Sequence, residues 1–420
     1  MAENLRADGI GFLEKAENKM KWMIFAAAAV LVLAVHLEAR KKKGLSWPDY
    51  GRELLGFGPQ KPGRQGYLDR LRFLAAMLVV LVHSMQSASS SLSAGGRAGG
   101  WWYVLTGAAG LGLCCNLLFV MISGALLLPG RDEGAALFFR KRVLNVVLPM
   151  AAYYWFYLHR SGLLSFNLPS LWGAVKTVAA GPMELVPHFW LLYVLIRLSF
   201  MVPLFRLAEG RLTDKARLRI VLVVLLGLGA KAVLYFRGMG FGFDTVWFSW
   251  EGIFLVGYVL AKVKDRKYDR AIWAAGLAAG GLIVWIHCTR ADGAVIAAND
   301  SLLMAAFSMA VFLWFSRREG RAGQRKRISL IPAMAVRLIS RYSYSILLIH
   351  WFMLFVVVEK HMHIHPFMFG ENLVLAGVFL QSAAALFFSL VFALLYDNTV
   401  VLAAKRCAGL LLPGRPPAGN

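Results

Sequence analysis

Cysteine is scarce in this chain, and acidic residues are half as common as basic ones. The 420 residues include four cysteines, and none has the spacing of a metal site or a disulfide framework. Charged residues make up only 16% of the chain, whereas hydrophobic residues make up 59%, and the mean hydropathy is +0.59. This composition excludes an ordinary soluble globular protein and favours a membrane protein.

Long polar segments and internal repeats are also missing, so no loop has room for a soluble catalytic domain. The apolar runs reach the ~20 residues that a helix needs to cross a hydrocarbon core of about 30 Å. The sequence therefore predicts an all-α polytopic membrane protein. We expect eleven spans, near residues 22–38, 71–88, 104–128, 143–159, 188–205, 219–236, 247–263, 271–288, 301–316, 342–359 and 373–396.

The net charge of +23 is unevenly distributed along the chain. If the N-terminus lies outside, most of the 46 Lys and Arg fall in inside segments, as the positive-inside rule requires. We therefore interpret the charge as a signal of orientation in the cell (inner) membrane and expect no nucleic acid partner. An inner surface this cationic would attract anionic membrane lipid or an anionic cosubstrate.

The first apolar run is followed by a basic cluster, which favours an uncleaved anchor helix with its N-terminal side outside. Removing it would leave ten spans. We expect an extracytoplasmic N-terminus, an additional transmembrane helix, a cytoplasmic connector, a membrane domain and a cytoplasmic tail, over residues 1–21, 22–38, 39–66, 67–396 and 397–420.

Arg72 and His83 are the most informative pair of residues. Eleven steps of an α-helix return almost to the starting angle, so the two share a face about 16 Å apart along the axis. Ionisable groups at this depth usually face a cavity and mark a site. Asp69, Arg70 and Ser84 accompany them. The alternatives are a hydrogen-bonded structural histidine and arginines that only fix topology.

A second basic helix start contains Arg140 and Arg142, with Asn145 one turn after Arg142 on the same face. Two helices thus present arginines at one membrane level. Because arginine binds phosphate in a planar, bidentate manner, this arrangement suits a phosphate clamp. Ordinary flanking charge is the alternative.

Two further helix starts carry polar and aromatic residues. One contains His188, Trp190 and Tyr193, which suit either a pocket or an interfacial aromatic belt. The other places Ser343 and His350 seven residues apart on one face, beside Tyr344.

Two cations lie inside predicted spans, Arg197 and Lys231, and either pair with a carboxylate such as Glu251 or snorkel to the interface. We predict no metal site.

Taken together, these segments resemble the integral-membrane acyltransferase-3 family and, within it, the surface-polysaccharide O-acetyltransferase branch. The similarity runs from about residue 67 to 396. It rests on six segments in the family's order, namely 68–84, 118–128, 139–149, 188–203, 254–258 and 343–350.

The resemblance implies a ten-helix core that moves an acyl group, usually acetyl, from cytoplasmic acyl-CoA to a hydroxyl of an envelope polysaccharide or glycolipid. It implies no tightly bound cofactor, with acetyl-CoA as cosubstrate. The family's Arg-x10-His pair falls on Arg72 and His83. Its Arg-x-x-Arg motif falls on Arg142 and Asn145, so that Arg140 is the nearby candidate to replace the second arginine. Its usual second tyrosine before the late histidine is Leu347 here.

The mechanism expected from these residues has His83 as general base for the acceptor hydroxyl, because an imidazole titrates near neutral pH. The arginines would hold the CoA phosphates, and Asp69 would orient Arg72. His350 and Trp190 would line the acceptor side, with Asn145 or Ser84 as oxyanion donor. A transient acyl-imidazole on His83 is an open variant.

Two other classes of protein are compatible with this sequence. A transporter or lipid-linked glycan flippase also needs polar groups at mid-depth, although the inverted repeats frequent in transporters are not visible here. A non-enzymatic assembly subunit would use the same groups to join helices.

Overall fold

The computed structural model describes residues 29–58, 65–96, 99–129, 133–163, 168–237, 246–290, 296–319 and 333–411. Within these ranges the regular structure is entirely helical, which confirms the all-α fold class. The chain divides into two compact units, Pro59–Leu394 and a smaller one formed by Met1–Gly58 with Leu395–Asn420.

Seven helical segments among the described residues are long and apolar enough to cross a membrane, as expected of a polytopic membrane protein. They are Gly66–Ala94, Gly100–Leu127, Pro187–Glu209, Asp214–Phe236, Asp269–Thr289, Ala333–His361 and Glu371–Leu410. Three further helices occupy predicted spans: α7 (Leu148–Arg160), α11 (Val246–Lys262) and α14 (Leu302–Glu319). The expected outside segment 1–21 and the start of the expected span 22–38 lie outside the described residues.

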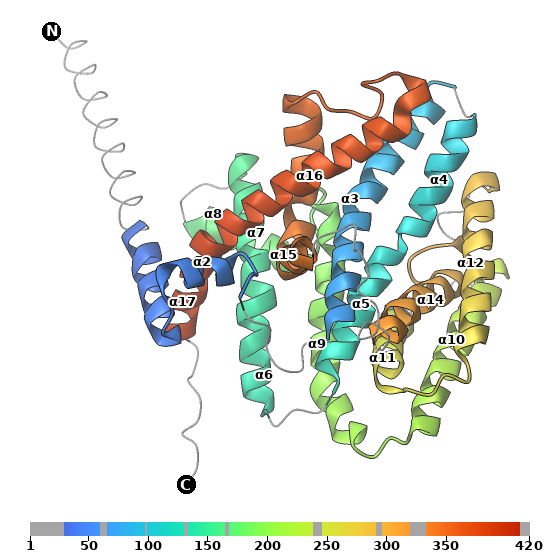
Figure 1. Ribbon diagram of the computed structural model, residues 1–420, viewed down its shortest axis with the longest axis horizontal. Helices are drawn as coiled ribbons and strands as arrows, with labels where there is room; N and C mark the ends of the chain where they lie inside the picture. The colour runs from blue at the N-terminus through green and yellow to red at the C-terminus, as the bar shows by residue number, and fades with distance from the viewer. Residues whose placement is uncertain are drawn as a thin grey trace. The chain divides into compact units, whose positions relative to one another are not determined.

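The larger unit is organised around α3 (Gly66–Ala94), which packs on four other helices. Its partners are α4 (Gly100–Gly112), α5 (Cys114–Leu127), α14 and α15 (Ala333–Phe352). Figure 1 shows α3 and α4 side by side, with α11, α12 and α14 gathered beyond α5.

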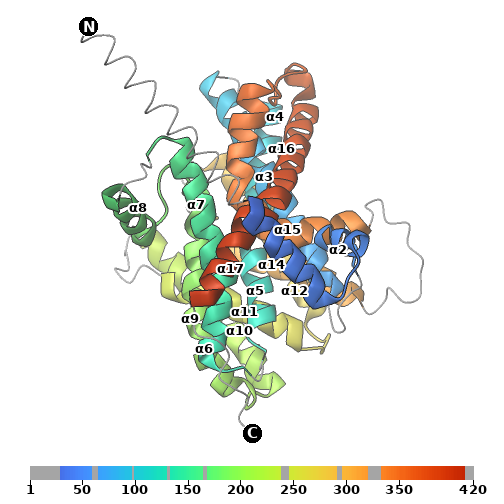
Figure 2. The ribbon, with the colours of Figure 1, turned by 90° about the vertical axis from the view of Figure 1, so that its left-hand side faces the viewer.

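The remaining elements complete the larger unit around these helices. The short α8 lies on the flank of α7 (Figure 2). The bounds are α6 (Ala135–Arg142), α8 (Leu168–Ala180), α9 (Trp190–Glu209), α10 (Asp214–Phe236), α12 (Asp269–Thr289), α16 (Val374–Tyr396), the π-helical turns η1 (Val143–Val147) and η3 (Met353–His361), and the 3-10 turns η2 (Pro187–Phe189) and η4 (Glu371–Leu373).

Helices α5 and α11 touch through their backbones at two glycines. A Cβ added at Gly124 would overlap the carbonyl oxygen of Phe254, and one added at Gly257 would overlap that of Met121. Small residues allow this close approach, which supplies much of the packing between membrane helices. Both glycines belong to the sequence segments that carry the family resemblance.

The two cations predicted inside spans both pair with carboxylates. Arg197 lies 3.1 Å from Glu251 (Nε to Oε1), so α9 and α11 share an ion pair. Lys231 pairs with Asp300, which also accepts a hydrogen bond of 3.2 Å from Ser249. Pairing reduces the cost of a charge in the membrane interior, and the structure selects it over snorkelling.

In the smaller unit, a helix over residues 29–43 packs with α2 (Trp47–Leu54), η5 (Asp397–Val401) and α17 (Leu402–Leu411). His36 makes hydrogen bonds with the Tyr50 hydroxyl at 2.9 Å and the Asn398 carbonyl at 2.7 Å. Arg406 donates two hydrogen bonds to the Glu38 carboxylate. The chain after residue 396 thus continues as helix and bonds to the segment near residue 38.

Candidate active site

One cavity in the larger unit is lined by arginines, and we call it the arginine cavity. Its volume is about 340 Å³, within the range of small-molecule sites. Its charged and polar lining residues come from six elements of the bundle: Arg72, Ser123, Arg142, Asn145, Ser199, Ser340, Arg341, Ser343 and Tyr344. Apolar lining is supplied by Phe119, Ile122, Leu127, Val146, Leu195 and Leu347.

Arg72 enters this cavity from the second turn of α3. The buried carboxylate of Asp69 lies 3.8 Å from its guanidinium and accepts a hydrogen bond of 2.7 Å from Ser340 of α15. The carboxylate is thereby fixed by a second helix. Asp69 can therefore orient Arg72 from behind, outside the cavity lining.

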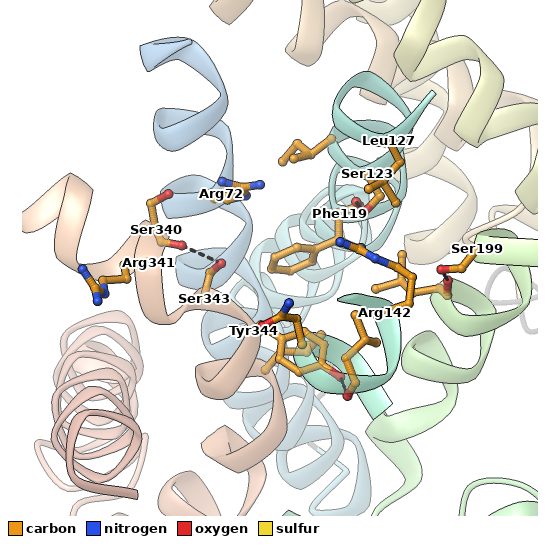
Figure 3. Close-up of a pocket in the computed structure, with 15 residues that line it drawn as sticks. Arg72, Phe119, Ser123, Leu127, Arg142, Ser199, Ser340, Arg341, Ser343 and Tyr344 are labelled. Carbon is orange, nitrogen blue, oxygen red and sulfur yellow. Dashed lines mark hydrogen bonds between the residues drawn. The ribbon is translucent and has the colours of Figure 1, made fainter. Parts of the chain in front are cut away.

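Arg142 enters the same cavity from the end of α6. Figure 3 shows Arg72 and Arg142 extending toward one space from different helices, whereas Arg341 points away from it at the rim. The π-helical turn η1 follows Arg142 at once, and Pro149 beyond it has no N–H to return to the carbonyl of Asn145. This irregular turn places Asn145 in the lining, where it donates to the Lys141 carbonyl at 2.9 Å.

Arg206 bonds residues on both sides of the connection between α5 and α6, beside the arginine cavity. It donates to the Leu127 carbonyl at 2.7 and 3.0 Å, which caps the C-terminal end of α5, and to Glu133 at 3.2 Å. Lys141 also pairs with Glu133, and its hydrogen bond is the main reason that the pKa of this carboxyl lies below its ordinary value.

A second cavity contains histidines, and we call it the histidine cavity. Its volume is about 310 Å³. It is lined by Val79, Val82, His83, Gln86, Leu113, Cys115, Asn116, Pro187, His188, Trp190, Asn299, Leu347, His350 and Trp351. None of these described lining residues is Asp, Glu, Lys or Arg.

Three histidines and a tryptophan meet in this cavity from three helical segments. The rings of His83 and His350 are stacked, with centroids 5.2 Å apart, and His188 meets His350 edge-on at 4.9 Å. Trp351 contacts His83 edge-on at 4.9 Å and stacks on His188 at 5.8 Å. These contacts hold the imidazoles in one aromatic cluster.

The hydrogen bonds differ among the three imidazoles. His350 uses Nδ1 on the Leu347 carbonyl at 2.9 Å, and His188 uses Nε2 on the Leu348 carbonyl at 3.1 Å. Because a carbonyl only accepts, these nitrogens carry the protons in neutral rings. His83 is less buried than the other two and bonds Gln86 one turn later. It is therefore the imidazole best exposed to a molecule in the cavity.

The two cavities follow one another along the same helices. On α3, Arg72 lines the first and His83 the second, about 16 Å further along the axis. On α15, Ser340, Ser343 and Tyr344 line the first, whereas His350 and Trp351 line the second. Helices α5 and α9 likewise contribute to both. The cationic and the imidazole chemistry thus lie at successive levels of one bundle.

Most predicted site residues converge on these cavities. Arg72, Arg142, Asn145, Ser343 and Tyr344 line the arginine cavity, and His83, His188, Trp190 and His350 line the histidine cavity. Six others lie outside both linings: Asp69, Arg70, Ser84, Arg140, Tyr193 and Glu251.

Some residues outside the linings join other elements instead. Ser84 donates at 2.5 Å to Gln381 of α16, and Gln381 donates at 2.9 Å to Glu359. Tyr193 donates to the carbonyls of Val178 and Gly181, which joins α9 to the end of α8.

Several lining residues were missed by the sequence reasoning. Trp351 directly follows His350, and Asn116 is a lone polar residue in an apolar run, so both had a visible signal. Asn116 donates to Asn299 at 3.0 Å, which pairs two amides at the histidine cavity. Gln86, Ser340 and Arg341 had no signal beyond helical spacing.

These features define the class of the protein as a multi-pass, all-α membrane protein with a cationic and an imidazole-lined cavity. The model of the acyltransferase-3 family, described as an acyltransferase domain, matches residues 65–397, well over half of the chain. The chain therefore belongs to this family and is a membrane acyltransferase. Comparison with curated proteins found no match, and comparison with solved structures found none either.

Proposed function

We propose that this protein is an O-acetyltransferase of the inner membrane. It moves an acetyl group from cytoplasmic acetyl-CoA to a hydroxyl of an envelope polysaccharide or glycolipid. The observation that carries this proposal is the succession of the two cavities along α3 and α15. One cavity suits a phosphorylated donor, and the next suits proton transfer from a hydroxyl.

The arginine cavity is the proposed donor site. Arg72 and Arg142 converge on it from two helices, and guanidinium groups bind phosphate through paired hydrogen bonds. Asn145 and Tyr344 add neutral polar groups beside them. In the membrane orientation expected from the distribution of Lys and Arg, the arginine cavity faces the cytoplasm. The N-terminus then lies outside and the C-terminus lies inside.

The histidine cavity is the proposed acceptor site, with His83 as general base. His83 takes the proton of the acceptor hydroxyl, whose oxygen attacks the thioester carbonyl carbon. The carbon–sulfur bond then breaks, and the CoA thiolate takes the proton from the imidazolium as it leaves. His350 stacks on the His83 ring and holds it in place. The Asn116 and Asn299 amides are positioned to bond an uncharged polar acceptor.

Radiolabelled acetyl-CoA tests the proposal directly. The purified full chain is incubated with labelled acetyl-CoA and membrane extract, and label in the glycan and lipid fractions is counted. His83→Ala is expected to lower transfer by about 10²- to 10⁴-fold, the usual contribution of a general base. His287→Ala is the matched control, because this membrane histidine bonds the Ile283 carbonyl and lines neither cavity.

Two results would contradict the proposal. Full transfer by a folded His83→Ala protein would remove His83 from the chemistry. Tight binding of acetyl-CoA by the wild type with no label reaching any acceptor would favour a binding or transport role.

A further inference from the structure

Leu347 occupies a particular position between the two cavities. Among the described lining residues it is the one that the arginine cavity and the histidine cavity share. Its side chain is apolar and only 3% exposed. A buried leucine thus lies where the cationic level of the bundle meets the imidazole level.

The helical register of α15 explains this position. Ser340, Ser343, Tyr344, Leu347, His350 and Trp351 lie on one stripe, because residues three and four apart share a face. The polar residues at the start of the stripe line the arginine cavity, and those at its end line the histidine cavity. Leu347 is the apolar step between them.

The proposed reaction requires the acyl end of acyl-CoA to reach past the Leu347 side chain. The CoA phosphates bind at the arginine level, whereas the hydroxyl is activated by His83 at the next level. The thioester carbonyl must therefore come to lie beside or beyond Leu347, and the acyl chain with it. A cavity of about 310 Å³ must then hold both the acyl group and the acceptor hydroxyl.

We propose that Leu347 sets the length of the acyl chain that the enzyme transfers, and restricts it to a short one. The inference rests on the proposed function and goes beyond it by assigning donor specificity to a single side chain. Replacing leucine by alanine removes three carbon atoms from the side chain between the two cavities and leaves more space there. A larger side chain there narrows the passage without touching the arginines that bind the donor.

A chain-length series of donors tests the proposal. Leu347→Ala, Leu347→Val, Leu347→Phe and wild type are compared with acetyl-, propionyl-, butyryl- and hexanoyl-CoA, and kcat/KM is measured for each. Leu347→Ala should raise the butyryl-to-acetyl ratio by about 10-fold or more, the usual effect of freeing space in an apolar pocket. Leu347→Val should also raise the butyryl-to-acetyl ratio, by a smaller factor. Leu347→Phe should lower kcat with acetyl-CoA and leave its KM near the wild-type value.

Ile349→Ala is the matched control, because Ile349 is equally buried on α15 and lines neither cavity. Its butyryl-to-acetyl ratio should stay at the wild-type value. An unchanged ratio in both Leu347→Ala and Leu347→Val, or an equal change in Ile349→Ala, would overturn the proposal while acetyl transfer by wild type still stands. If Leu347→Ala does not fold, the Leu347→Val and Leu347→Phe results decide. No transfer by wild type from any donor would overturn the proposed function and this inference together.

Discussion

The arginine cavity and the histidine cavity share helices α3, α5, α9 and α15 but differ in their chemistry. Arg72 and Arg142 converge on the first, whereas the described lining of the second contains no fully charged side chain. Charges in the first are supported from outside the lining, by the Asp69 carboxylate. Imidazoles in the second are supported by backbone carbonyls and by one another.

The difference shows how one bundle can separate binding from chemistry. A cation that holds a phosphate works best when an ion pair orients it. A base that takes a proton must stay neutral beforehand, so a surrounding of aromatic rings and amides suits it. Substitutions at the two levels should therefore have separable effects.

After His83→Ala, the largest effect should come from a substitution that disrupts both levels at once. Gly257→Ala places a methyl group against the Met121 backbone, where α11 meets α5. Overpacking of this kind costs about 1–3 kcal/mol, and we expect the high end because backbone cannot move aside. Gly281→Ala, where a Cβ meets open space, is the control. Thermal unfolding in detergent compares the two, and equal Tm values would show that the α5–α11 contact is not tight.

The next largest effect should be confined to the arginine level. Arg142→Ala should raise the KM for acetyl-CoA by about 10- to 100-fold, since a hydrogen bond to a charged group contributes about 1.5–3 kcal/mol. Arg140→Ala should have a smaller effect, because Arg140 lies on the same helix but outside the lining. Steady-state kinetics over a range of salt concentrations measures both. A larger loss with Arg140→Ala would transfer the phosphate contact to that residue.

A smaller effect is expected at Asp69, which pairs with Arg72 from outside the lining of the arginine cavity. Asp69→Asn keeps an acceptor for Ser340 but removes the charge beside Arg72. The KM for acetyl-CoA should rise about 5-fold, equivalent to a single hydrogen bond of about 1 kcal/mol, with kcat little changed. Asp269→Asn, which breaks the ion pair with Arg317, is the matched control. If Asp69→Asn instead lowered kcat alone, Asp69 would act in the chemistry.

The smallest effect concerns Glu133, which precedes α6, and it depends on pH. The pKa of Glu133 is lowered by its hydrogen bond to Lys141 and, after that, by its contacts with Arg206. Its contribution to stability is therefore present above the ordinary carboxyl pKa and is lost as pH falls through the lowered value. Glu133→Gln should lower Tm slightly at neutral pH, and the difference from wild type should disappear in acid. A Tm difference between Glu133→Gln and wild type that stays constant with pH would contradict this prediction.

The sequence predicted the convergence of helices better than the partners of individual side chains. Their positions on the predicted helices made Arg72, Arg142, His83 and His350 candidate site residues. The first two line the arginine cavity, and the last two line the histidine cavity. Helical spacing could not show that Ser84, one residue after His83, turns about 100° away to bond Gln381. Nor could it show that Asp69 is fixed by Ser340, a residue far along the chain.

The sequence also could not predict how closely two helices approach each other. Gly124 and Gly257 lay in recognisable segments, yet their backbone contact depends on which helices meet. Glu251 lies outside both cavity linings and pairs with Arg197, which is one of the two arrangements that the sequence left open for this cation. The position of Leu347 between two cavities follows only from the three-dimensional arrangement.

The separation of binding from chemistry is tested most directly by measuring both in the same two variants. Purified His83→Ala and Arg142→Ala proteins are assayed for acetyl-CoA affinity by calorimetry and for single-turnover acetyl transfer at saturating acetyl-CoA. We expect that His83→Ala binds acetyl-CoA with the wild-type Kd but transfers almost none, whereas Arg142→Ala binds weakly and transfers at close to the wild-type rate once saturated. Loss of binding in His83→Ala, or loss of saturated transfer in Arg142→Ala, would contradict it.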